Sequence, residues 1–298
     1  MHLARSLFPF LMVTLTGWGN TIAADRFTRG DVDQSGRISI TDAVHILEAL
    51  FGGGSAVSCE DAADVDDNGS LTVTDPVFLL ESLFRGGLPP ALPFPGCGED
   101  PSPDGLSCEA FEGCMFTFEF YGEELSADAV IFVTDQSVAM RDSGELNIAR
   151  MGIVPVIEAM PDGTLFATVF FDAGLRRFPD GAELAIASDE TRASGRTFVN
   201  QLPHGSGTCG GAALLSAIES ARLSGARRKL ILYVSGGDGI CTAEREDVYL
   251  RRILEEVTLA NSGLARIYTF PAPFATTSGK AFLRDLAERN GGSYVQVY

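Results

Sequence analysis

The pattern of hydrophobic and polar positions changes at about residue 125. Beyond that point, short continuous apolar runs alternate with segments in which apolar residues recur every three or four positions. The runs are typical of buried strands, and the longer period is typical of amphipathic helices. We predict strands at residues 129–135, 164–171, 229–235, 265–270 and 293–297. We predict helices at residues 145–160, where Pro155 introduces a kink, and at 188–202, 211–224, 244–262 and 279–290.

This alternation predicts the fold class of residues 125–298. Strands that alternate with helices indicate an α/β fold, here a doubly wound, mostly parallel, Rossmann-like sheet with helices on both faces. Ligands of such sheets bind beyond the carboxyl ends of the strands. Polar and glycine-rich loops follow the strands predicted to end at residues 135 and 235, and another spans 204–211. We therefore expect a binding surface at this edge.

An internal repeat dominates the pattern before residue 89. Residues 31–54 and 64–87 match with an offset of 33 residues. Each copy contains an acidic loop of twelve residues, an amphipathic helix and a Gly-Gly pair. The repeat predicts a small all-α module of two loop–helix units at residues 25–88.

Both acidic loops carry oxygen-bearing groups at positions 1, 3, 5, 7, 9 and 12. Calcium prefers six to eight hard oxygen ligands, so this spacing predicts two Ca²⁺ sites. The candidate ligands of the first loop are Asp31, Asp33, Ser35, the backbone carbonyl of Arg37, Ser39 and Asp42. Those of the second loop are Asp64, Asp66, Asn68, the backbone carbonyl of Ser70, Thr72 and Asp75. Gly36 and Gly69 stand at position 6, where the tight turn requires a positive φ.

The first 24 residues have the features of a secretory signal peptide. Arg5 supplies a positive charge, residues 7–15 are apolar, and small residues lead to Ala23 and Ala24, after either of which we expect cleavage. The apolar run is too short to span a bilayer, and no later run is a candidate, so we predict no membrane span. We expect a secreted protein, extracellular or at the cell surface.

The net charge of the chain makes some classes of binding partner less favourable than others. The chain has 298 residues, with 40 acidic against 22 basic side chains and a net charge of −18. An acidic surface repels phosphate, so the composition disfavours nucleic acids and anionic membranes as partners. An acidic surplus suits cations, in agreement with the two loops.

A proline- and cysteine-rich segment at 89–124 is predicted to link the module at 25–88 to the domain at 125–298. Six of the 14 prolines fall between Pro89 and Pro103, which disfavours helices and central strands, although residues 115–120 alternate like a short strand. Export favours disulfides among the six cysteines, which are Cys59, Cys97, Cys108, Cys114, Cys209 and Cys241. Of the 15 pairings that the sequence allows, we favour Cys59–Cys97, Cys108–Cys114 and Cys209–Cys241.

The two acidic repeats, with their DVDxxG loops, the Asp at position 12 and the helices that follow, resemble a dockerin type I domain over about 26–88. The LFxGG ends and the cysteine-rich tail are similar to dockerin-like modules of planctomycete secreted proteins. The resemblance implies docking onto an extracellular protein, with a cohesin-like protein as a candidate partner. Dockerins recognise cohesins through residues early in these helices, often a Ser-Thr pair. The corresponding pairs here are Ile40-Thr41 and Val73-Thr74.

The C-terminal half resembles a von Willebrand factor A domain over about 125–298. The resemblance is carried by DQSVAM at 135–140, the Gly-Thr loop at 207–208, VSGGDG at 234–239 and FLRDLAERNGGSY at 282–294. In that family a DxSxS loop, a Thr and an Asp form a metal-ion-dependent adhesion site for Mg²⁺, which a carboxylate of the partner completes.

The resemblance implies a degenerate form of this adhesion site. Asp135, Ser137 and Thr208 match it, but Ala139 and Gly236 replace an oxygen-bearing Ser and Asp. Asp238 is the nearby carboxylate that would have to substitute. We expect an interaction or adhesion domain that binds a protein partner without a strict need for Mg²⁺.

No enzymatic motif is complete. Ser235 follows a predicted strand, but Tyr233 replaces the Gly of a nucleophile elbow, and His2, His45 and His204 all precede it in the chain. Phosphate-binding and dinucleotide-binding motifs are also absent from the sequence. We predict a protein that is not an enzyme. The alternative is a secreted subunit of a polysaccharide-degrading complex, or a hydrolase, associated through the dockerin-like module.

Overall fold

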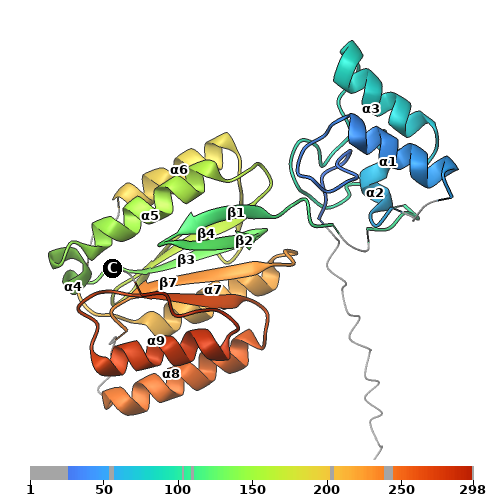
Figure 1. Ribbon diagram of the computed structural model, residues 1–298. Coiled ribbons are helices and arrows are strands. Elements are labelled where there is room, and N and C mark those ends of the chain that lie inside the picture. The colour runs from blue at the N-terminus through green and yellow to red at the C-terminus, as the bar shows by residue number, and fades with distance from the viewer. Residues whose placement is uncertain are drawn as a thin grey trace, which may run out of the picture.

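The computed structural model describes residues 26–53, 57–102, 104–108, 111–201, 205–237 and 244–296. These residues form an N-terminal helical part and a C-terminal α/β part (Figure 1). The predicted signal peptide at 1–24 lies outside the described residues. None of the described helices combines the length and the apolar character needed to cross a membrane.

The N-terminal part contains three helices. They are α1 (Ile40–Phe51), α2 (Glu60–Ala63) and α3 (Thr74–Arg85). A capping box starts α1: the side chain of Ser39 accepts a hydrogen bond from Thr41 N, and Asp42 Oδ2 accepts one from Ser39 N at 2.8 Å. In α3, Asp75 Oδ2 accepts a hydrogen bond from Thr72 N at the same distance. The helices enclose a small core of Ala43, Ile46, Ala63, Val65 and Leu79.

The proline- and cysteine-rich segment folds back onto these helices. Phe27 and Gly98 pair through two backbone hydrogen bonds of 2.9 and 3.0 Å, and the N–H of Ala91 donates to the carbonyl of Val65 at 3.1 Å. Its described residues form neither a helix nor a strand before residue 116, as its prolines predict. We refer to the described residues between 26 and 115 as the N-terminal module.

Two of the predicted disulfides are wrong. The structure pairs Cys59 with Cys108 and Cys97 with Cys114, instead of Cys59 with Cys97 and Cys108 with Cys114. Cys59 and Cys108 form an antiparallel backbone bridge, so the return of the chain selects the partner. The four sulfurs share a small core with Phe27, Ala62 and Phe111.

The C-terminal part is built on a six-stranded, mostly parallel sheet, as predicted. The strands β3 (Ala129–Asp135), β4 (Leu165–Phe171), β7 (Lys229–Ser235) and β8 (Arg266–Pro271) are parallel, in the order β4–β3–β7–β8. The short strands β5 (Leu175–Phe178) and β6 (Ala185–Ile186) pair antiparallel with β4 and were not predicted. Every residue of β3 and β4 is buried, which explains their continuous apolar runs.

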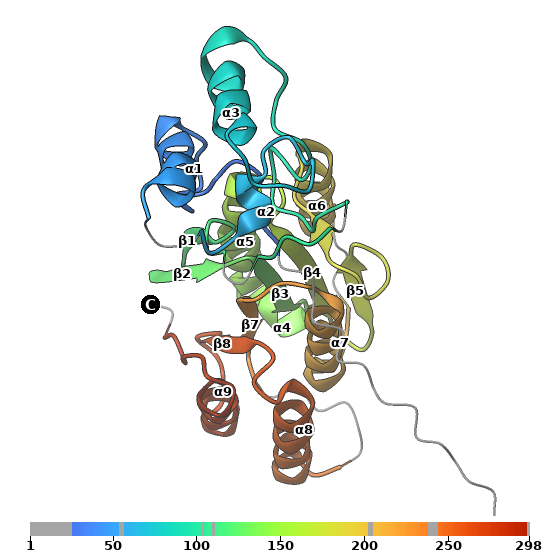
Figure 2. The same ribbon diagram turned by 90° about the vertical axis from the view of Figure 1, so that its right-hand side faces the viewer.

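Helices cover both faces of the sheet (Figure 2). The helices are α4 (Val138–Asp142), α5 (Glu145–Ala159), α6 (Asp189–Gln201), α7 (Gly210–Leu223), α8 (Glu246–Asn261) and α9 (Thr277–Arg289). One face packs on α5 and α6, and the other on α7, α8 and α9. All five predicted helices are present within three residues of their expected ends, and α5 continues through Pro155. The strand predicted at 293–297 is reduced, in its described residues, to a single bridge between Tyr294 and Thr269.

An antiparallel hairpin completes the face covered by α5 and α6. It consists of β1 (Phe116–Phe120) and β2 (Glu123–Ala127). Alternate residues of β1 are buried, and the ring of Phe120 lies 5.7 Å from that of Phe132 and 4.9 Å from that of Phe270. The predicted boundary between residues 124 and 125 therefore falls inside β2, and the hairpin packs with the sheet.

Candidate functional site

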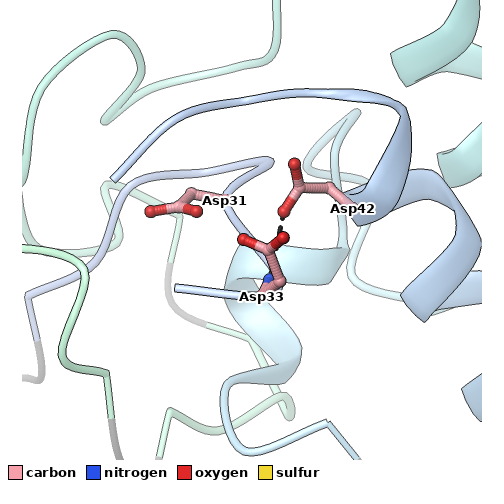
Figure 3. A group of neighbouring side chains, drawn as sticks. All are labelled: Asp31, Asp33 and Asp42. Atoms are coloured by element: carbon pink, nitrogen blue, oxygen red, sulfur yellow. Dashed lines mark hydrogen bonds between the residues drawn. The ribbon is translucent and has the colours of Figure 1, made fainter. Parts of the chain in front are cut away.

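The first acidic loop brings three carboxylates together (Figure 3). Oxygen atoms of Asp31, Asp33 and Asp42 lie within 4.8 Å of one another. Asp31 Oδ2 accepts the N–H of Gly36 at 2.9 Å, and Asp42 Oδ1 accepts those of Val32 and Asp33 at 2.8 and 3.0 Å. Asp31 Oδ1 is buried and has no hydrogen-bond partner. The loop backbone thus fixes the carboxylates and leaves one buried oxygen unsatisfied.

The second loop repeats this arrangement. Oxygen atoms of Asp64, Asp66 and Asp75 also lie within 4.8 Å of one another. Asp64 Oδ2 accepts the N–H of Gly69 at 2.8 Å, and Asp75 Oδ1 accepts that of Val65 at 2.9 Å. Asp64 and Asp75 are fully buried, like Asp42 in the first loop. Two loops 33 residues apart in sequence thus share the bonds from positions 2 and 6, whereas Asp64 Oδ1, unlike Asp31 Oδ1, accepts an N–H, that of Asn68 at 3.2 Å.

Backbone conformation confirms the equivalence of the loops. Position 4 has a positive φ in both, 59° at Gln34 and 58° at Asp67. Position 6 also has a positive φ in both, 77° at Gly36 and 79° at Gly69. Non-glycine residues seldom adopt such angles, so the loop geometry is specified at two positions of each copy.

Burial and crowding disfavour the charged forms of several loop carboxylates. The pKa of Asp31 and that of Asp75 are each raised to about 6, chiefly by burial and also by neighbouring carboxylates, against backbone hydrogen bonds that lower them. Burial also raises the pKa of Asp42 and Asp66. In Asp33, hydrogen bonds from Ser35 and Thr41 outweigh burial and lower the pKa. A cation between the carboxylates would relieve the repulsion.

The other candidate ligands lie around these carboxylates. They are Ser35, Arg37, Ser39, Asn68, Ser70 and Thr72, all half-buried or exposed. The hydroxyl of Ser35 donates to the carbonyl of Arg37 at 3.1 Å, and the amide of Asn68 donates to the carboxylate of Asp66. The hydroxyls of Ser39 and Thr72 each pair with the threonine two residues on, at 2.6 Å. The hydroxyl groups of Ser35, Ser39 and Thr72 therefore form hydrogen bonds within their own loops.

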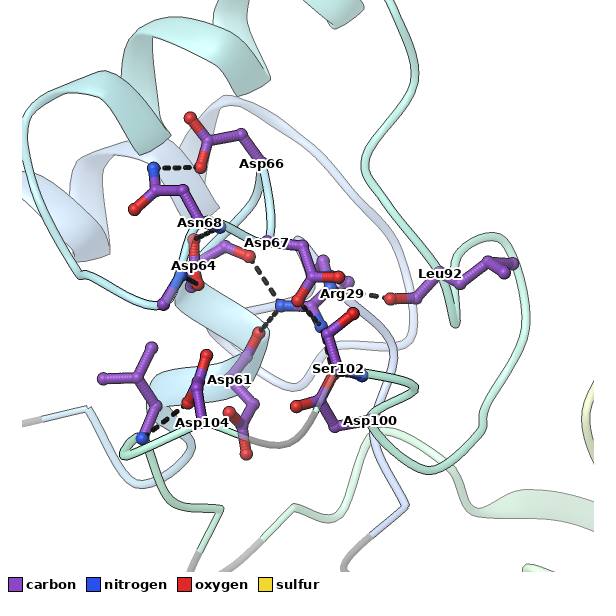
Figure 4. A network of polar contacts seen from close by, with 12 residues as sticks. Arg29, Asp61, Asp64, Asp66, Asp67, Asn68, Leu92, Asp100, Ser102 and Asp104 are labelled. Carbon is purple, nitrogen blue, oxygen red and sulfur yellow. Dashed lines mark hydrogen bonds and ion pairs between the residues drawn. The ribbon is translucent and has the colours of Figure 1, made fainter.

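A buried arginine beside the second loop was missed by the sequence analysis (Figure 4). Arg29 is 1% exposed, and its Nη2 lies 2.8 Å from carboxylate oxygens of both Asp67 and Asp100. Its Nη1 donates to the backbone carbonyls of Asp61 and Asp64 at 2.8 and 2.7 Å. Arg29 therefore fastens the second loop to the proline-rich segment. The only signal in the sequence was a basic residue next to a strongly acidic repeat.

The helices after the loops expose apolar side chains at equivalent positions. These are Ile40 and Val73, Val44 and Val77, and Phe51 and Phe84, with exposed fractions between 45% and 72%. In each helix the three positions are i, i+4 and i+11, which lie on one face. The repeat has thus duplicated an exposed apolar stripe as well as a loop.

At the carboxyl edge of the sheet, Asp135 is a buried carboxylate. Its Oδ1 accepts the N–H of Ser137 at 2.8 Å, and its Oδ2 accepts the hydroxyl of Ser235 at 3.2 Å. The hydroxyl of Ser235 in turn accepts the N–H of Gly237 at 3.1 Å. Burial raises the pKa of Asp135 to about 6 against these hydrogen bonds.

The other predicted residues of the adhesion site are only partly brought to this edge. Thr208 is half-buried in the loop before α7. Asp238 lies outside the described residues. Cys209 is disulfide-bonded, and its expected partner, Cys241, also lies outside them. In the described part of the chain, every group of three or more acidic, His or Cys side chains that could hold a metal ion belongs to the N-terminal module.

Asp172, directly after β4, organises the same edge and was missed. Its carboxylate accepts hydrogen bonds from the side chains of Gln136 and Arg176 at 3.0 and 2.9 Å and from Gly174 N at 2.8 Å. Burial opposes its charge, but the bonds from Gly174 and Arg176 prevail and lower its pKa. Its backbone carbonyl accepts the N–H of Cys209 at 2.7 Å. The signal was an acidic residue at the end of a predicted strand.

Comparison with known proteins informs the C-terminal part alone. No family model and no curated protein matches the chain. Its fold is similar to a solved von Willebrand factor type A structure from Catenulispora acidiphila, with a TM-score of 0.50 and 20% identity over 57% of this chain and 38% of that one. The chain therefore spans well under half of that protein.

Two further solved structures have lower TM-scores. The PilB minor pilin from Streptococcus sanguinis gives 0.46 at 14% identity, over 57% of this chain and 56% of that one. The conserved hypothetical protein BatB from Bacteroides thetaiotaomicron gives 0.43 at 16% identity, over 57% and 89%. The similarity to the Catenulispora acidiphila structure alone indicates that the C-terminal part has a von Willebrand factor A-like fold, and it is a likeness of fold only.

Proposed function

We propose that this chain is a secreted calcium-binding protein with two interaction modules. A dockerin-like N-terminal module binds two Ca²⁺ ions and docks onto an extracellular protein, and the von Willebrand factor A-like domain binds a second protein. The observation that carries the proposal is the duplicated loop, in which three carboxylates converge within 4.8 Å.

Calcium suits the chemistry of these loops. Asp31, Asp33 and Asp42 would hold the first ion and Asp64, Asp66 and Asp75 the second, with the carbonyls of Arg37 and Ser70 at position 7. The orphaned buried oxygen of Asp31 supports this assignment, because a buried carboxylate oxygen without a partner carries a desolvation cost that a cation would offset. Extracellular modules of this kind bind Ca²⁺ at about 10⁻⁴–10⁻³ M.

The docking surface in this proposal is the exposed apolar face of α1 and α3. Exposed apolar side chains on a small module favour association with another protein. Because each apolar stripe begins at position 10 of its loop, two residues before the last candidate ligand, ion binding would fix the helix that presents it. A cohesin-like extracellular protein is the kind of partner that we propose.

Recognition by the second module would not depend on Mg²⁺. Mg²⁺ requires near-ideal octahedral geometry. Here Asp135 is already engaged by Ser137 and Ser235, while Ala139 and Gly236 offer no side-chain oxygen. We propose that the partner is bound through loop shape and direct polar contacts around Asp135, Thr208 and Asp238.

The test combines Asp31→Ala with Asp64→Ala. We expect this variant to lose the calcium-dependent rise in melting temperature of the N-terminal module, and to melt in calcium as the unsubstituted protein does in EDTA. The control combines Glu255→Ala with Asp285→Ala, two exposed carboxylates of α8 and α9, and should keep the calcium response. Unchanged melting of the unsubstituted protein in EDTA would contradict calcium binding.

Docking is tested separately by capture of partners from the native secretome. We expect a protein to be retained by the full chain in calcium and released in EDTA, and not to be retained by the double aspartate variant. Substitution of Phe51 and Phe84 by Ser, which leaves the carboxylates intact, should abolish capture without changing calcium binding. Equal capture with and without calcium would contradict docking through this module.

A further inference from the structure

A cavity of about 290 Å³ lies at the amino-terminal ends of β3, β7 and β8, the edge of the sheet opposite Asp135. Four basic residues line it, namely Arg227, Arg228, Lys229 and Arg266. Phe111 and the loop at 263–265 also line it, together with two acidic residues, Asp128 and Glu112. In a chain of net charge −18, such a concentration of positive charge requires an explanation.

The carboxylate of Asp128, which also lines the cavity, forms hydrogen bonds with backbone N–H groups. Asp128 is 5% exposed, and its two oxygens accept the N–H groups of Arg227 and Arg228 at 2.8 Å each. Asp128 therefore holds the turn that leads into β7. Glu112 is exposed to solvent.

Among the described residues, three of the four cations have no counter-charge at contact distance. In the part of the chain that the structure describes, the side chains of Arg228, Lys229 and Arg266 form no ion pair, whereas Arg192, for example, contacts both Asp162 and Asp189. Lys229 is half-buried, and burial lowers its pKa although Asp128 raises it. Lys229 is thus a partly desolvated cation, whereas Arg227, Arg228 and Arg266 are exposed at the rim.

The starts of two neighbouring strands supply these cations to the cavity. Arg228 and Lys229 are consecutive and lead into β7, and Arg266 opens the neighbouring strand, where it pairs in register with Leu230. The three side chains thus come from adjacent strands at one edge. Guanidinium groups present forked donors that match the oxygens of a carboxylate, sulfate or phosphate, and an ammonium adds a point charge.

We propose that this cavity is a binding site for a compact oxyanion, a sulfate or carboxylate group that is either free or carried by a ligand no larger than a monosaccharide. The cavity volume limits the ligand to this size. Long polyanions are disfavoured because the net charge of the whole protein repels them. The site shares no lining residue with the calcium loops or with the carboxyl edge of the sheet.

The experiment is calorimetric titration of the full chain in calcium, at constant ionic strength maintained with NaCl. The probes are sodium sulfate, galactose 6-sulfate and glucuronate. We expect saturable binding of at least one probe. Tighter binding of galactose 6-sulfate or glucuronate than of sulfate would identify a carbohydrate ligand. Equal affinity for sulfate and galactose 6-sulfate would identify the free anion as the ligand. Both outcomes support the site. Absence of saturable binding of all three probes would overturn it.

Variants locate the binding. Arg228→Gln, Lys229→Gln and Arg266→Gln combined should weaken it at least about tenfold, since each removes a charged donor. The matched control is Arg251→Gln, Arg284→Gln and Arg289→Gln, which removes the same charge from exposed positions on α8 and α9 and should bind like the unsubstituted chain. Arg266→Gln alone is a milder second variant, and its melting curve verifies folding. Equal affinity of the site variant and the control would overturn the proposal.

Discussion

Asp31 and Asp135 are both almost fully buried, and burial raises the pKa of each to about 6. Their neighbours differ. Asp31 lies within 4.8 Å of two further carboxylates and keeps an oxygen without a partner. Asp135 belongs to no such group among the described residues, and both of its oxygens accept hydrogen bonds. A cation would therefore be bound more strongly beside Asp31 than beside Asp135.

Asp135→Asn should change stability in a pH-dependent way. The folded-state pKa of Asp135, about 6, exceeds the ordinary value of 3.8, so the folded protein binds more protons between these values. Stability therefore falls as pH rises from 4 to 6 and stays lower above 6. The variant escapes this loss and should be more stable at pH 8 by about 1–2 kcal/mol, after the cost of one altered hydrogen bond.

Denaturant unfolding at pH 4 and pH 8, in calcium, measures this difference. At pH 4 the variant should be less stable by about 1 kcal/mol, the cost of the altered hydrogen bond, so the order of the two stabilities should reverse between pH 4 and pH 8. A variant that is less stable at pH 8, with a deficit that grows on addition of Mg²⁺, would show instead that Asp135 holds a cation.

Arg29→Met should destabilise the N-terminal module. The substitution leaves the carboxylates of Asp67 and Asp100 without their shared cation and removes donors from three backbone carbonyls. Loss of one partner from a buried charge network costs about 3–5 kcal/mol. Thermal unfolding in calcium should show this loss in the transition of the N-terminal module. Arg85→Met, which removes an exposed arginine, is the control and should change stability by less than about 1 kcal/mol.

At the scale of elements, the proline-rich segment owes its position to cross-links more than to regular structure. Its described residues before β1 form no helix or strand, yet they contact both loops. An added Cβ at Gly113 would meet Asp31 Oδ2 at 2.5 Å, and one at Gly69 would meet Asp104 Oδ2 at 3.1 Å. The segment therefore covers the loops closely at two glycines.

Removal of the Cys59–Cys108 disulfide should destabilise the N-terminal module more than removal of the Cys97–Cys114 disulfide. Cys59–Cys108 closes a separation of 49 residues and Cys97–Cys114 one of 17. Loop-closure entropy predicts losses of about 4 and about 3 kcal/mol for the paired alanine variants. Denaturant unfolding of each variant gives the order, and peptide mapping under non-reducing conditions checks the pairs. A peptide that joins Cys59 to Cys97 would contradict the structure.

The hairpin β1–β2 helps α5 and α6 to cover one face of the sheet. Phe120→Ala should leave a cavity against Phe132 and Phe270 and destabilise the α/β domain by about 3–5 kcal/mol. Phe274→Ala is the matched control, because Phe274 is 40% exposed, and its loss should be much smaller. Calorimetry of both variants tests this, and equal losses would show that the hairpin is not part of the domain core.

On the scale of the whole molecule, the two parts meet at Arg26. This residue is 7% exposed and donates to the carbonyl of Cys97 at 2.6 Å and to that of Gly163. The two parts nevertheless have separate hydrophobic cores. Separate cores favour separate unfolding transitions.

Removal of calcium should change the unfolding transition of the N-terminal module and leave that of the α/β domain unchanged. We expect scanning calorimetry to show that EDTA lowers only the transition of the N-terminal module, because the acidic clusters of the described residues all lie there. Mn²⁺ added to the calcium-loaded chain should leave the transition of the α/β domain unchanged. A rise in that transition which Asp238→Ala abolishes would show a repaired adhesion site.

The sequence by itself determined the features that depend on local spacing. Strand 129–135 and the helices after it were predictable because burial on a regular element imposes a period on the apolar residues. The carboxylates from Asp31 to Asp42 come together within one loop, and the repeat at Asp64 to Asp75 doubled the signal. At these positions, neighbours in sequence are also neighbours in space.

Only the tertiary structure decided the features that join distant residues. The partner of Cys59, the network of Arg29 and the place of Phe120 all depend on where the proline-rich segment returns, and no periodicity records that path. The same holds for the cavity, where β7 and β8 begin side by side and both Lys229 and Arg266 line it. Contacts between distant segments are set by the packing of the whole chain, which the local pattern does not specify.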